Sequence, residues 1–284
     1  MATMLSITNP KDKVVIFSPF YENYGADTIL SGAEPIYVPL VPPDFTFSIE
    51  QLENAFKQGA KALILCNPSN PCGKVFTFEE LTAIADVVKK YDAYVVTDEV
   101  YEHIVYAPNK HIYMQALDGM RERTIVCNSL SKTYSITGWR LGYACAPHNI
   151  MEQMIKLHQF AIMCAPTNSQ FAAVEAMRNC DAEVSKMVEA YNQRRRYLLN
   201  AFEQMGIECF EPFGAFYVFP SIKKFGMTSE EFCTKLLQEE KLAVVPGTAF
   251  GACGEGYVRI SYAYSIENLK VGLERIKNFI NRID

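Results

Sequence analysis

Residues 62–99 read ALILCNPSNPCGKVFTFEELTAIADVVKKYDAYVVTDE and decide the fold of the chain. The stretch begins and ends with apolar runs of strand length, at 62–67 and 93–99. Between them, Thr77-Phe-Glu-Glu80 has the residues of a capping box, in which a hydroxyl and a later carboxylate satisfy each other's free backbone donors. Apolar residues then recur at helical spacing. The stretch therefore predicts a strand, a helix and a second strand, which together form the unit of a parallel sheet.

The same alternation extends through the first half of the chain. The strand-length runs are almost continuously apolar, which suits strands that helices cover on both faces. A second start signal, Ser48-Ile-Glu-Gln51, precedes another helical pattern. We therefore expect an α/β fold with a mostly parallel, doubly wound sheet, whose further strands are VVIF at 14–17, PIYVPL at 35–40, TIVCNS at 124–129 and LGYACAP at 141–147.

The pattern changes at about Thr167, where a long helical region begins. A helix pair of this length can connect two domains. Beyond it, short strand-like pieces alternate with a helix that opens near Thr228 and with an amphipathic last helix over 266–283. We expect a large domain over residues 1–180 and, over 181–284, an interdomain helix with a smaller α+β domain. The strands expected there are GAFYVFP at 214–220, LAVVPG at 242–247 and YVRISYA at 257–263.

The composition is that of an ordinary globular protein and excludes several classes of partner. The 284 residues include 27 Lys and Arg against 32 Asp and Glu, a net charge of −5, and the longest basic run is Arg194–Arg196. Such a chain offers no positively charged surface for nucleic acid or an anionic membrane. No segment approaches the ~20 uninterrupted apolar residues of a membrane span. No targeting segment opens the chain, so we expect a cytoplasmic protein.

The cysteines and histidines favour neither disulfides nor metals. Nine cysteines contain no Cys-x-x-Cys pair, which is typical of neither a secreted disulfide framework nor a zinc site. Cys72 is interpreted as a packing residue. The sequence predicts no metal site, because no ligand spacing relates the four histidines, which are interpreted as structural or surface residues: His103, His111, His148 and His158.

Three polar clusters follow strands at the carboxyl edge of the predicted sheet, where ligands of α/β sheets bind. The densest is SLSKTYSITGWRLGY at 129–143, whose hydroxyls, lysine and arginine suit a cofactor that carries a phosphate. Asp98 ends another strand, shortly before Tyr101, and a carboxylate in such a place needs a cationic partner. The turn Asn67-Pro-Ser-Asn70 ends a third strand and offers an amide donor. The clusters predict one site at one edge of the sheet.

In this order, the clusters resemble the fold-type I enzymes that use pyridoxal phosphate (PLP), specifically the class I and II aminotransferases of the aspartate, aromatic and kynurenine group. The resemblance covers essentially the whole chain. It implies that Lys132 forms the Schiff base with the cofactor and later moves the Cα proton of the substrate. It also implies that Asp98 pairs with the pyridinium nitrogen, because a buried aspartate favours the charged ring that PLP needs as an electron sink. Tyr101 and Asn70 would bind the phenolic oxygen.

The resemblance also implies which residues bind anions. Ser129 and Arg140 match the phosphate ligands of the family, and Ser131 is a further candidate. Arg259, in YVRIS, matches the arginine that binds the α-carboxylate of the substrate, together with Asn70. Arginine suits both anions because its planar fork binds two oxygens at once, which lysine cannot do.

One aromatic residue is implied as the group that stacks on the cofactor ring. Tyr21, two residues after Pro19 in SPFYENYG, matches this position. Its aromatic neighbours remain alternatives, since Phe20 or Tyr24 could supply the ring contact or merely pack.

The resemblance begins roughly one hundred residues into the sequences of the family, after a glycine-rich segment that opens a phosphate-binding helix. We expect the first residues, from Met1, to lie within that helix. The phosphate would then rely more on Ser129, Ser131 and Arg140, and the substrate pocket would lack one wall.

The resemblance implies an aminotransferase that moves an amino group from an L-α-amino acid to a 2-oxo acid, with 2-oxoglutarate and glutamate as one pair. Two alternatives stay open. One is a PLP-dependent carbon–sulfur β-lyase on the same scaffold, and the other is a truncated homologue with weak or no activity. The expected partners are a small amino acid, a 2-oxo acid and a second copy of the chain, in a homodimer with its active site at the subunit interface.

Overall fold

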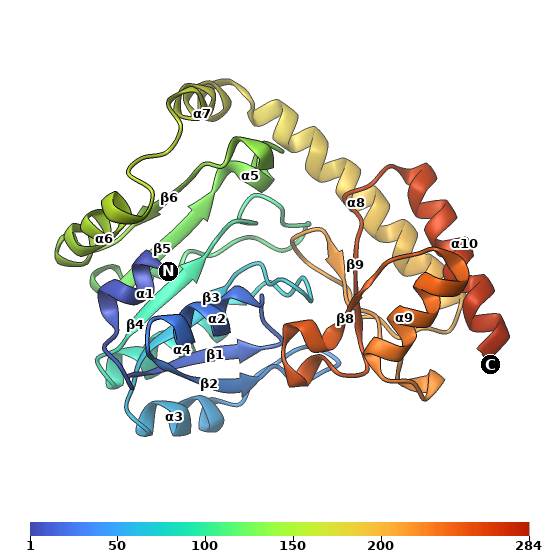
Figure 1. The fold of residues 1–284 in the computed structure, drawn as a ribbon, viewed down its shortest axis with the longest axis horizontal. Helices are drawn as coiled ribbons and strands as arrows, with labels where there is room; N and C mark the ends of the chain where they lie inside the picture. Colours follow the sequence, from blue (N-terminus) through green and yellow to red (C-terminus); the bar gives the residue numbers. More distant parts are fainter. Residues whose placement is uncertain (284) are drawn as a thin grey trace.

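The computed structural model describes residues 1–283, and a sheet of six strands forms its larger part (Figure 1). The strand order is β2-β1-β3-β4-β5-β6. The first five strands pair in parallel, and β6 is antiparallel to β5. The prediction of an α/β fold with a mostly parallel sheet is confirmed. The strands are β1 (Lys13–Ser18), β2 (Glu34–Pro39), β3 (Ala60–Cys66), β4 (Tyr94–Asp98), β5 (Thr124–Ser129) and β6 (Gly142–Cys145).

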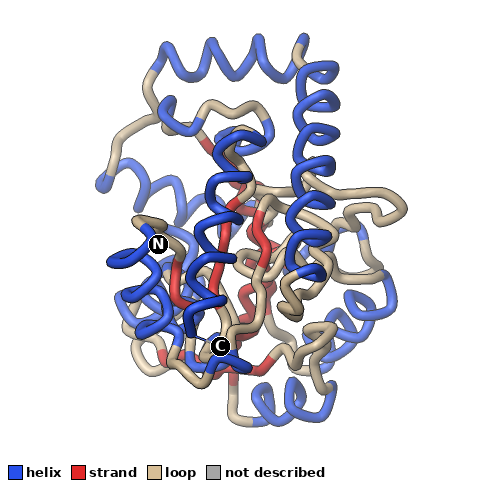
Figure 2. Tube along the Cα trace, turned by 90° about the vertical axis from the view of Figure 1, so that its right-hand side faces the viewer, coloured by secondary structure: helices blue, strands red, loops and turns tan. Residues whose placement is uncertain are grey.

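Helices cover both faces of this sheet because successive strand residues point to opposite sides. Val15 of β1 packs in one apolar cluster with Leu52 of α3 and Leu81 of α4, whereas its neighbour Val14 packs in another with Met4 of α1 and Ile150 of α6. Figure 2 shows the strands in the middle of the molecule with helices around them. The helices of this part are α1 (Ala2–Ile7), α2 (Asn23–Leu30), α3 (Ile49–Lys57), α4 (Phe78–Lys90), α5 (Leu130–Thr133) and α6 (His148–Ala161).

The two predicted capping boxes differ in the hydrogen bonds that they form. Thr77 accepts a bond from the backbone of Glu80 and receives the reciprocal bond, so the capping box at α4 is complete. Ser48 accepts from the backbone nitrogen of Gln51 at 3.3 Å, but within residues 1–283 the Gln51 side chain does not return the bond. The helix α6 was not predicted, because its apolar residues follow the strand β6 without a clear start signal.

The second part of the molecule is built on three short strands and the last helices. The sheet order is β7-β9-β8, and α8 runs from α7 toward it (Figure 1). The strands are shorter than their apolar runs in the sequence, with β7 at Tyr217–Val218, β8 at Val245–Pro246 and β9 at Val258–Ser261. The predicted domain boundary at residues 180 and 181 falls between α7 and α8 and stays a prediction. The helices are α7 (Thr167–Asn179), α8 (Asp181–Gln204), α9 (Ser229–Glu240) and α10 (Ile266–Ile283), and 3-10 turns lie at Met114–Ala116, Arg121–Arg123, Thr137–Trp139, Lys223–Phe225, Gly247–Phe250 and Ala252–Gly254.

Two further observations concern membranes and cysteines. Within residues 1–283, no helix combines the length and the apolarity that crossing a bilayer requires. The nine cysteines are free thiols. Cys72 is fully buried and its thiol donates to Ser69 Oγ at 3.4 Å, which agrees with a packing role.

Candidate active site

One cavity at the carboxyl edge of the large sheet collects the site residues that the sequence predicts. Its volume is about 510 Å3. Three parallel strands end there, β3, β4 and β5, and β9 of the small sheet faces them across the opening. All nine predicted residues line it: Tyr21, Asn70, Asp98, Tyr101, Ser129, Ser131, Lys132, Arg140 and Arg259.

The register of the parallel strands explains this convergence. Asp98 is paired across β4 with Cys66 of β3 on one side and with Cys127 of β5 on the other. All three residues line the cavity. Because parallel strands that start at one edge also end together at the other, each polar segment that follows a strand enters the same cavity.

Asp98 lies in this cavity without a cationic partner. No Lys, Arg or His within residues 1–283 forms an ion pair with it. Its Oδ2 accepts from the Tyr24 hydroxyl at 2.6 Å and its Oδ1 from the backbone of Val100 at 3.2 Å. Burial raises the pKa of Asp98, and these two bonds oppose that rise. The carboxylate is thus held in place and still available to a cation.

Lys132 lies on the short helix α5, and Ser129 is the N-cap of this helix. The Ser129 hydroxyl accepts from the backbone of Ser131 at 3.1 Å and donates to Ser131 Oγ at 2.9 Å or to the carbonyl of Leu141 at 3.1 Å. No acceptor within residues 1–283 takes the Ser131 hydroxyl proton. Gly142 allows β6 to pass close to this turn, since a Cβ there would lie 2.6 Å from the Asn128 carbonyl. The buried Ser131 hydroxyl can therefore donate to a ligand.

Three cationic side chains meet in the cavity without an acidic partner. Lys132, Arg140 and Arg259 form no ion pair with any residue in 1–283. Burial, and then the charges of Arg140 and Arg259, lower the pKa of Lys132. Arg140 is exposed and its Nη1 donates to the carbonyl of Thr137 at 3.0 Å. Because these three cations form no ion pair within residues 1–283, they are available to bind an anion.

Arg259 is positioned by polar and aromatic contacts. Its Nη1 donates to Asn70 Oδ1 at 2.9 Å. Its guanidinium carbon lies 4.5 Å from the ring centre of Tyr217 and 4.6 Å from that of Phe250, which are cation–π distances. Because Asn70 uses its oxygen for Arg259 and its Nδ2 has no acceptor within 1–283, the amide can donate to a ligand.

Tyr101 is buried beside a second tyrosine that sequence reasoning missed. The hydroxyl oxygens of Tyr101 and Tyr217 lie 3.0 Å apart. Burial, and then the neighbouring Tyr217, raise the pKa of Tyr101, so its hydroxyl stays protonated. Tyr217 belongs to the run GAFYVFP, whose apolar character predicts a strand. Nothing in that pattern distinguishes Tyr217, which is the residue of the run that lines the cavity.

The three aromatic residues that follow β1, Phe20, Tyr21 and Tyr24, make different contacts. Phe20 stacks on Tyr37 with ring centres 5.0 Å apart, and it does not line the cavity. Tyr21 lines the cavity, and its ring meets that of Tyr24 edge to face at 5.7 Å. Of the three alternatives, Tyr21 and Tyr24 remain near the site, and only Tyr24 bonds to Asp98.

Six further lining residues were not predicted: Glu22, Cys66, Val100, Cys127, Asn128 and Thr137. Asn128 has the clearest role, because its Oδ1 accepts from the backbone of Ser129 at 2.7 Å and its Nδ2 donates to Glu102 at 2.7 Å. A polar residue next to Ser129 at the end of an apolar strand was the signal that could have found it.

His111, which the sequence interprets as a structural or surface residue, is buried beside a glutamate. Its Nε2 lies 3.2 Å from Glu99 Oε2, and both side chains are buried. Together with Glu102 they offer ligand-type atoms within 4.8 Å of one another. The bonds from His111 and Asn128 already engage these carboxylates, so we assign no metal here.

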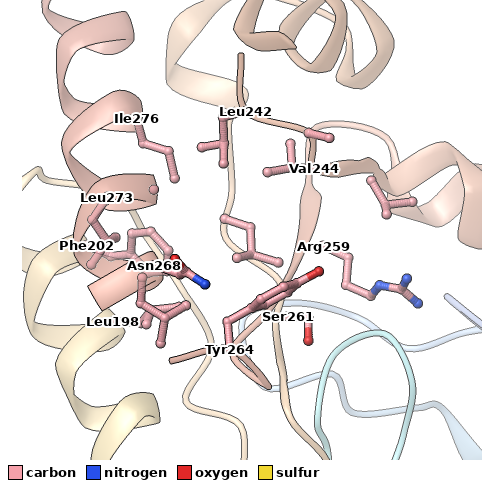
Figure 3. A pocket seen from close by; sticks show the side chains of 15 residues that line it. Leu198, Phe202, Leu242, Val244, Arg259, Ser261, Tyr264, Asn268, Leu273 and Ile276 are labelled. Atoms are coloured by element: carbon pink, nitrogen blue, oxygen red, sulfur yellow. The ribbon is translucent and has the colours of Figure 1, made fainter. Parts of the chain in front are cut away.

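A second cavity, of about 410 Å3, lies on the other side of β9 (Figure 3). Apolar side chains of α8, α10 and the segment before β8 line it, among them Phe202, Leu242 and Leu273. Arg259 is the one charged residue among those that line it, and its guanidinium points away from the apolar side chains. This cavity has no set of acids, bases and nucleophiles, so the chemistry belongs to the first.

Known proteins resemble the chain over nearly its whole length. A family model for aminotransferase class I and II matches residues 1–276. The putative aminotransferase YugH of Bacillus subtilis is 44% identical over 278 residues, which are 98% of this chain and 72% of that protein. An aspartate aminotransferase of Pyrococcus abyssi is 41% identical over 95% of this chain and 70% of that protein.

Solved structures share the fold. An aromatic aminotransferase from Pyrococcus horikoshii superposes with a TM-score of 0.96 at 38% identity, over 99% of this chain and 76% of that one. An aspartate aminotransferase from Thermus thermophilus with maleate gives 0.92 at 33% identity, over 98% and 72%. These similarities show that the chain has the fold of the PLP-dependent transferases. The chain belongs to the class I and II aminotransferase family, and it is an enzyme of that family.

We expect the amine of Lys132 to titrate below the usual range of a lysine in the protein without cofactor, because burial and two arginines disfavour its charge. The measurement is the rate of acylation of Lys132 against pH, followed by peptide mass spectrometry. Arg140→Met should move the midpoint upward only in part, since burial remains. Arg121→Met, at the opposite end of β5, is the matched control. A midpoint at or above the ordinary lysine value would contradict this electrostatic account.

Proposed function

We propose that this chain is a PLP-dependent aminotransferase that moves the amino group of an L-α-amino acid to a 2-oxo acid, with 2-oxoglutarate and glutamate as one pair. One observation carries the proposal: Lys132, Asp98 and Arg259 line one cavity, and none of them has an ion-pair partner within residues 1–283. The names of relatives that act on aspartate and aromatic amino acids support the choice of an amino acid.

The chemistry of the donor set fits PLP. A carboxylate without a cation suits a protonated ring nitrogen, and a buried hydroxyl with a free proton beside an arginine suits a phosphate. When bound, PLP supplies a sink for the electrons of a broken Cα bond. The residues that would hold it are Asp98 at the ring nitrogen, Tyr101 and Asn70 at the phenolic oxygen, Tyr21 at the ring face, Lys132 at the aldehyde carbon, and Ser129, Ser131 and Arg140 at the phosphate.

Lys132 and Arg259 would act on the amino acid. Burial and the nearby arginines lower the pKa of Lys132, which increases the fraction of its amine that is neutral. The neutral amine would be the base that takes the proton from Cα. Arg259 would bind the α-carboxylate through its fork. Asn70 and the rings of Tyr217 and Phe250 already fix that fork, so the substrate is held in few orientations.

We also propose that the chain forms a homodimer through an apolar surface on α6 and α7. Phe160 is 91% exposed and Phe171 is 74% exposed. This α6–α7 face consists of Ile155, Phe160, Ile162, Met163, Phe171, Val174 and Met177. Apolar patches of this kind on a globular protein are typical of interfaces. Ser169 of α7 donates to the carbonyl of Trp139 at 2.6 Å, so the face adjoins the loop that carries Arg140.

The first prediction from this proposal tests the function itself. Wild-type protein mixed with PLP should show a visible absorbance band that Lys132→Ala lacks and that Lys61→Ala, at the exposed start of β3, retains. An amino acid should remove the band and 2-oxoglutarate should restore it. The measurement is the absorbance spectrum with a panel of amino acids. Formation of pyruvate and ammonia without a 2-oxo acid would instead favour a lyase, and absence of a Lys132-dependent band would contradict PLP chemistry in this chain.

A second prediction concerns the substrate carboxylate. Arg259→Lys should raise the KM for the amino acid about 10- to 100-fold, because a single ammonium cannot replace the bidentate fork. The PLP band should remain, since Arg259 does not hold the cofactor. Steady-state kinetics checks this, with Arg275→Lys on α10 as the control. An unchanged KM in Arg259→Lys would place carboxylate binding elsewhere.

A third prediction addresses assembly. Wild-type protein should have the mass of a dimer in analytical ultracentrifugation, and Phe160→Asp with Phe171→Asp should give monomer, because two charges would be buried without partners. Phe78→Asp, at an exposed position of α4, should leave the dimer intact. A wild-type monomer, or a dimer that persists in the double variant, would rule out the α6–α7 face as the interface.

A further inference from the structure

One hydrogen bond in the cavity joins two segments that lie 74 residues apart in the sequence. The hydroxyl of Tyr24, in α2, donates to Asp98 Oδ2 at 2.6 Å. Hydroxyl-to-carboxylate bonds of about 2.5–2.7 Å are charge-assisted and roughly twice as strong as neutral ones. Tyr24 is the one side chain within residues 1–283 that donates to this carboxylate.

The bond matters because Asp98 has little other support. Its second oxygen accepts only from the backbone of Val100, at 3.2 Å. Burial, the main influence, raises the pKa of Asp98, and the Tyr24 hydroxyl is the first influence that lowers it. Two donors, one for each oxygen, fix the plane of the carboxylate. Its charge is stabilised but not cancelled, because a hydroxyl carries no net charge.

Tyr24 is itself held firmly and stays a donor. Its backbone nitrogen donates to the carbonyl of Tyr21 at 3.0 Å, and its own carbonyl accepts from Thr28 Oγ1 at 2.8 Å. Its ring packs edge to face on Tyr21 at 5.7 Å. Burial, and then the charge of Asp98, raise the pKa of Tyr24 well above its ordinary value, so the hydroxyl remains protonated at working pH.

We propose that Tyr24 is a positioning residue, which acts through Asp98 on the ring nitrogen of the cofactor and fixes the orientation of the carboxylate that meets it. This inference rests on the proposed PLP function. Through its contact with Tyr21, the same side chain links the ring-stacking residue to the residue at the ring nitrogen. Tyr24 does not touch the reacting atoms, so its loss should weaken cofactor binding without changing the site that reads the amino acid.

Tyr24→Phe tests this role, since it removes the hydroxyl and keeps the ring. The dissociation constant of PLP, measured by equilibrium dialysis, should rise about tenfold, the loss of one charge-assisted bond. The carbocyclic analogue of PLP, which has a CH group in place of the ring nitrogen, should bind wild type and Tyr24→Phe equally. The KM for the amino acid should stay the same. Tyr37→Phe, in the edge strand β2, is the matched control and should leave all of these values unchanged.

A double-mutant cycle separates the specific role from loss of packing. In an Asp98→Asn background, Tyr24→Phe should change PLP affinity by less than about twofold, because the charged acceptor is already gone. Equal losses for PLP and its carbocyclic analogue, or additive losses in the cycle, would overturn the proposal, as would an unchanged PLP affinity in Tyr24→Phe. If wild type forms the Lys132-dependent band, such results refute the role of Tyr24 alone. A wild type without that band would refute the proposed function and the inference together.

Discussion

A carboxylate in the cavity without an ion-pair partner is the constraint on which the rest of the site depends. Asp98 ends β4, and burial opposes its charge, so the fold must supply donors or a ligand must supply the counter-charge. The chain supplies two neutral donors, from Tyr24 and Val100, and leaves the positive charge to come from outside. The lysine and two arginines in the same cavity form no ion pair with Asp98, which keeps cationic and anionic subsites separate.

The second requirement is that two sheets meet. Lys132 and Asp98 belong to the carboxyl edge of the large sheet, whereas Arg259 comes from β9 of the small one. The bond from Arg259 to Asn70, 189 residues away, is a direct link between them. In the proposed function, Arg259 of the small sheet binds the substrate carboxylate, and Lys132 of the large sheet moves the Cα proton. The relative position of the two sheets would therefore set the distance and orientation between these two groups.

Sequence reasoning predicted the part of this architecture that local patterns determine. Apolar runs predicted the six strands of the large sheet to within two residues at each end. The carboxyl ends of these strands and the segments after them contain all the predicted site residues except Arg259, which lies in β9 of the small sheet. The strands of the small sheet were expected to be longer than they are, since apolar runs such as GAFYVFP are buried as loops as well as strands. Tyr217 and Asn128 were missed because their neighbours in space, Tyr101 and Glu102, are far from them in sequence.

The charge of the group that binds Asp98 determines whether this carboxylate can still attract a cationic ligand. A lysine or arginine beside Asp98 would form an ion pair, and the carboxylate would then offer little charge to a ligand. A hydroxyl stabilises the ionised form by a hydrogen bond and adds no counter-charge, so the electrostatic attraction for a cationic ring nitrogen survives. Tyr21, just before α2, and Tyr24, in the first turn of α2, thus give the cavity both an aromatic face and the donor that stabilises the charged form of its acid.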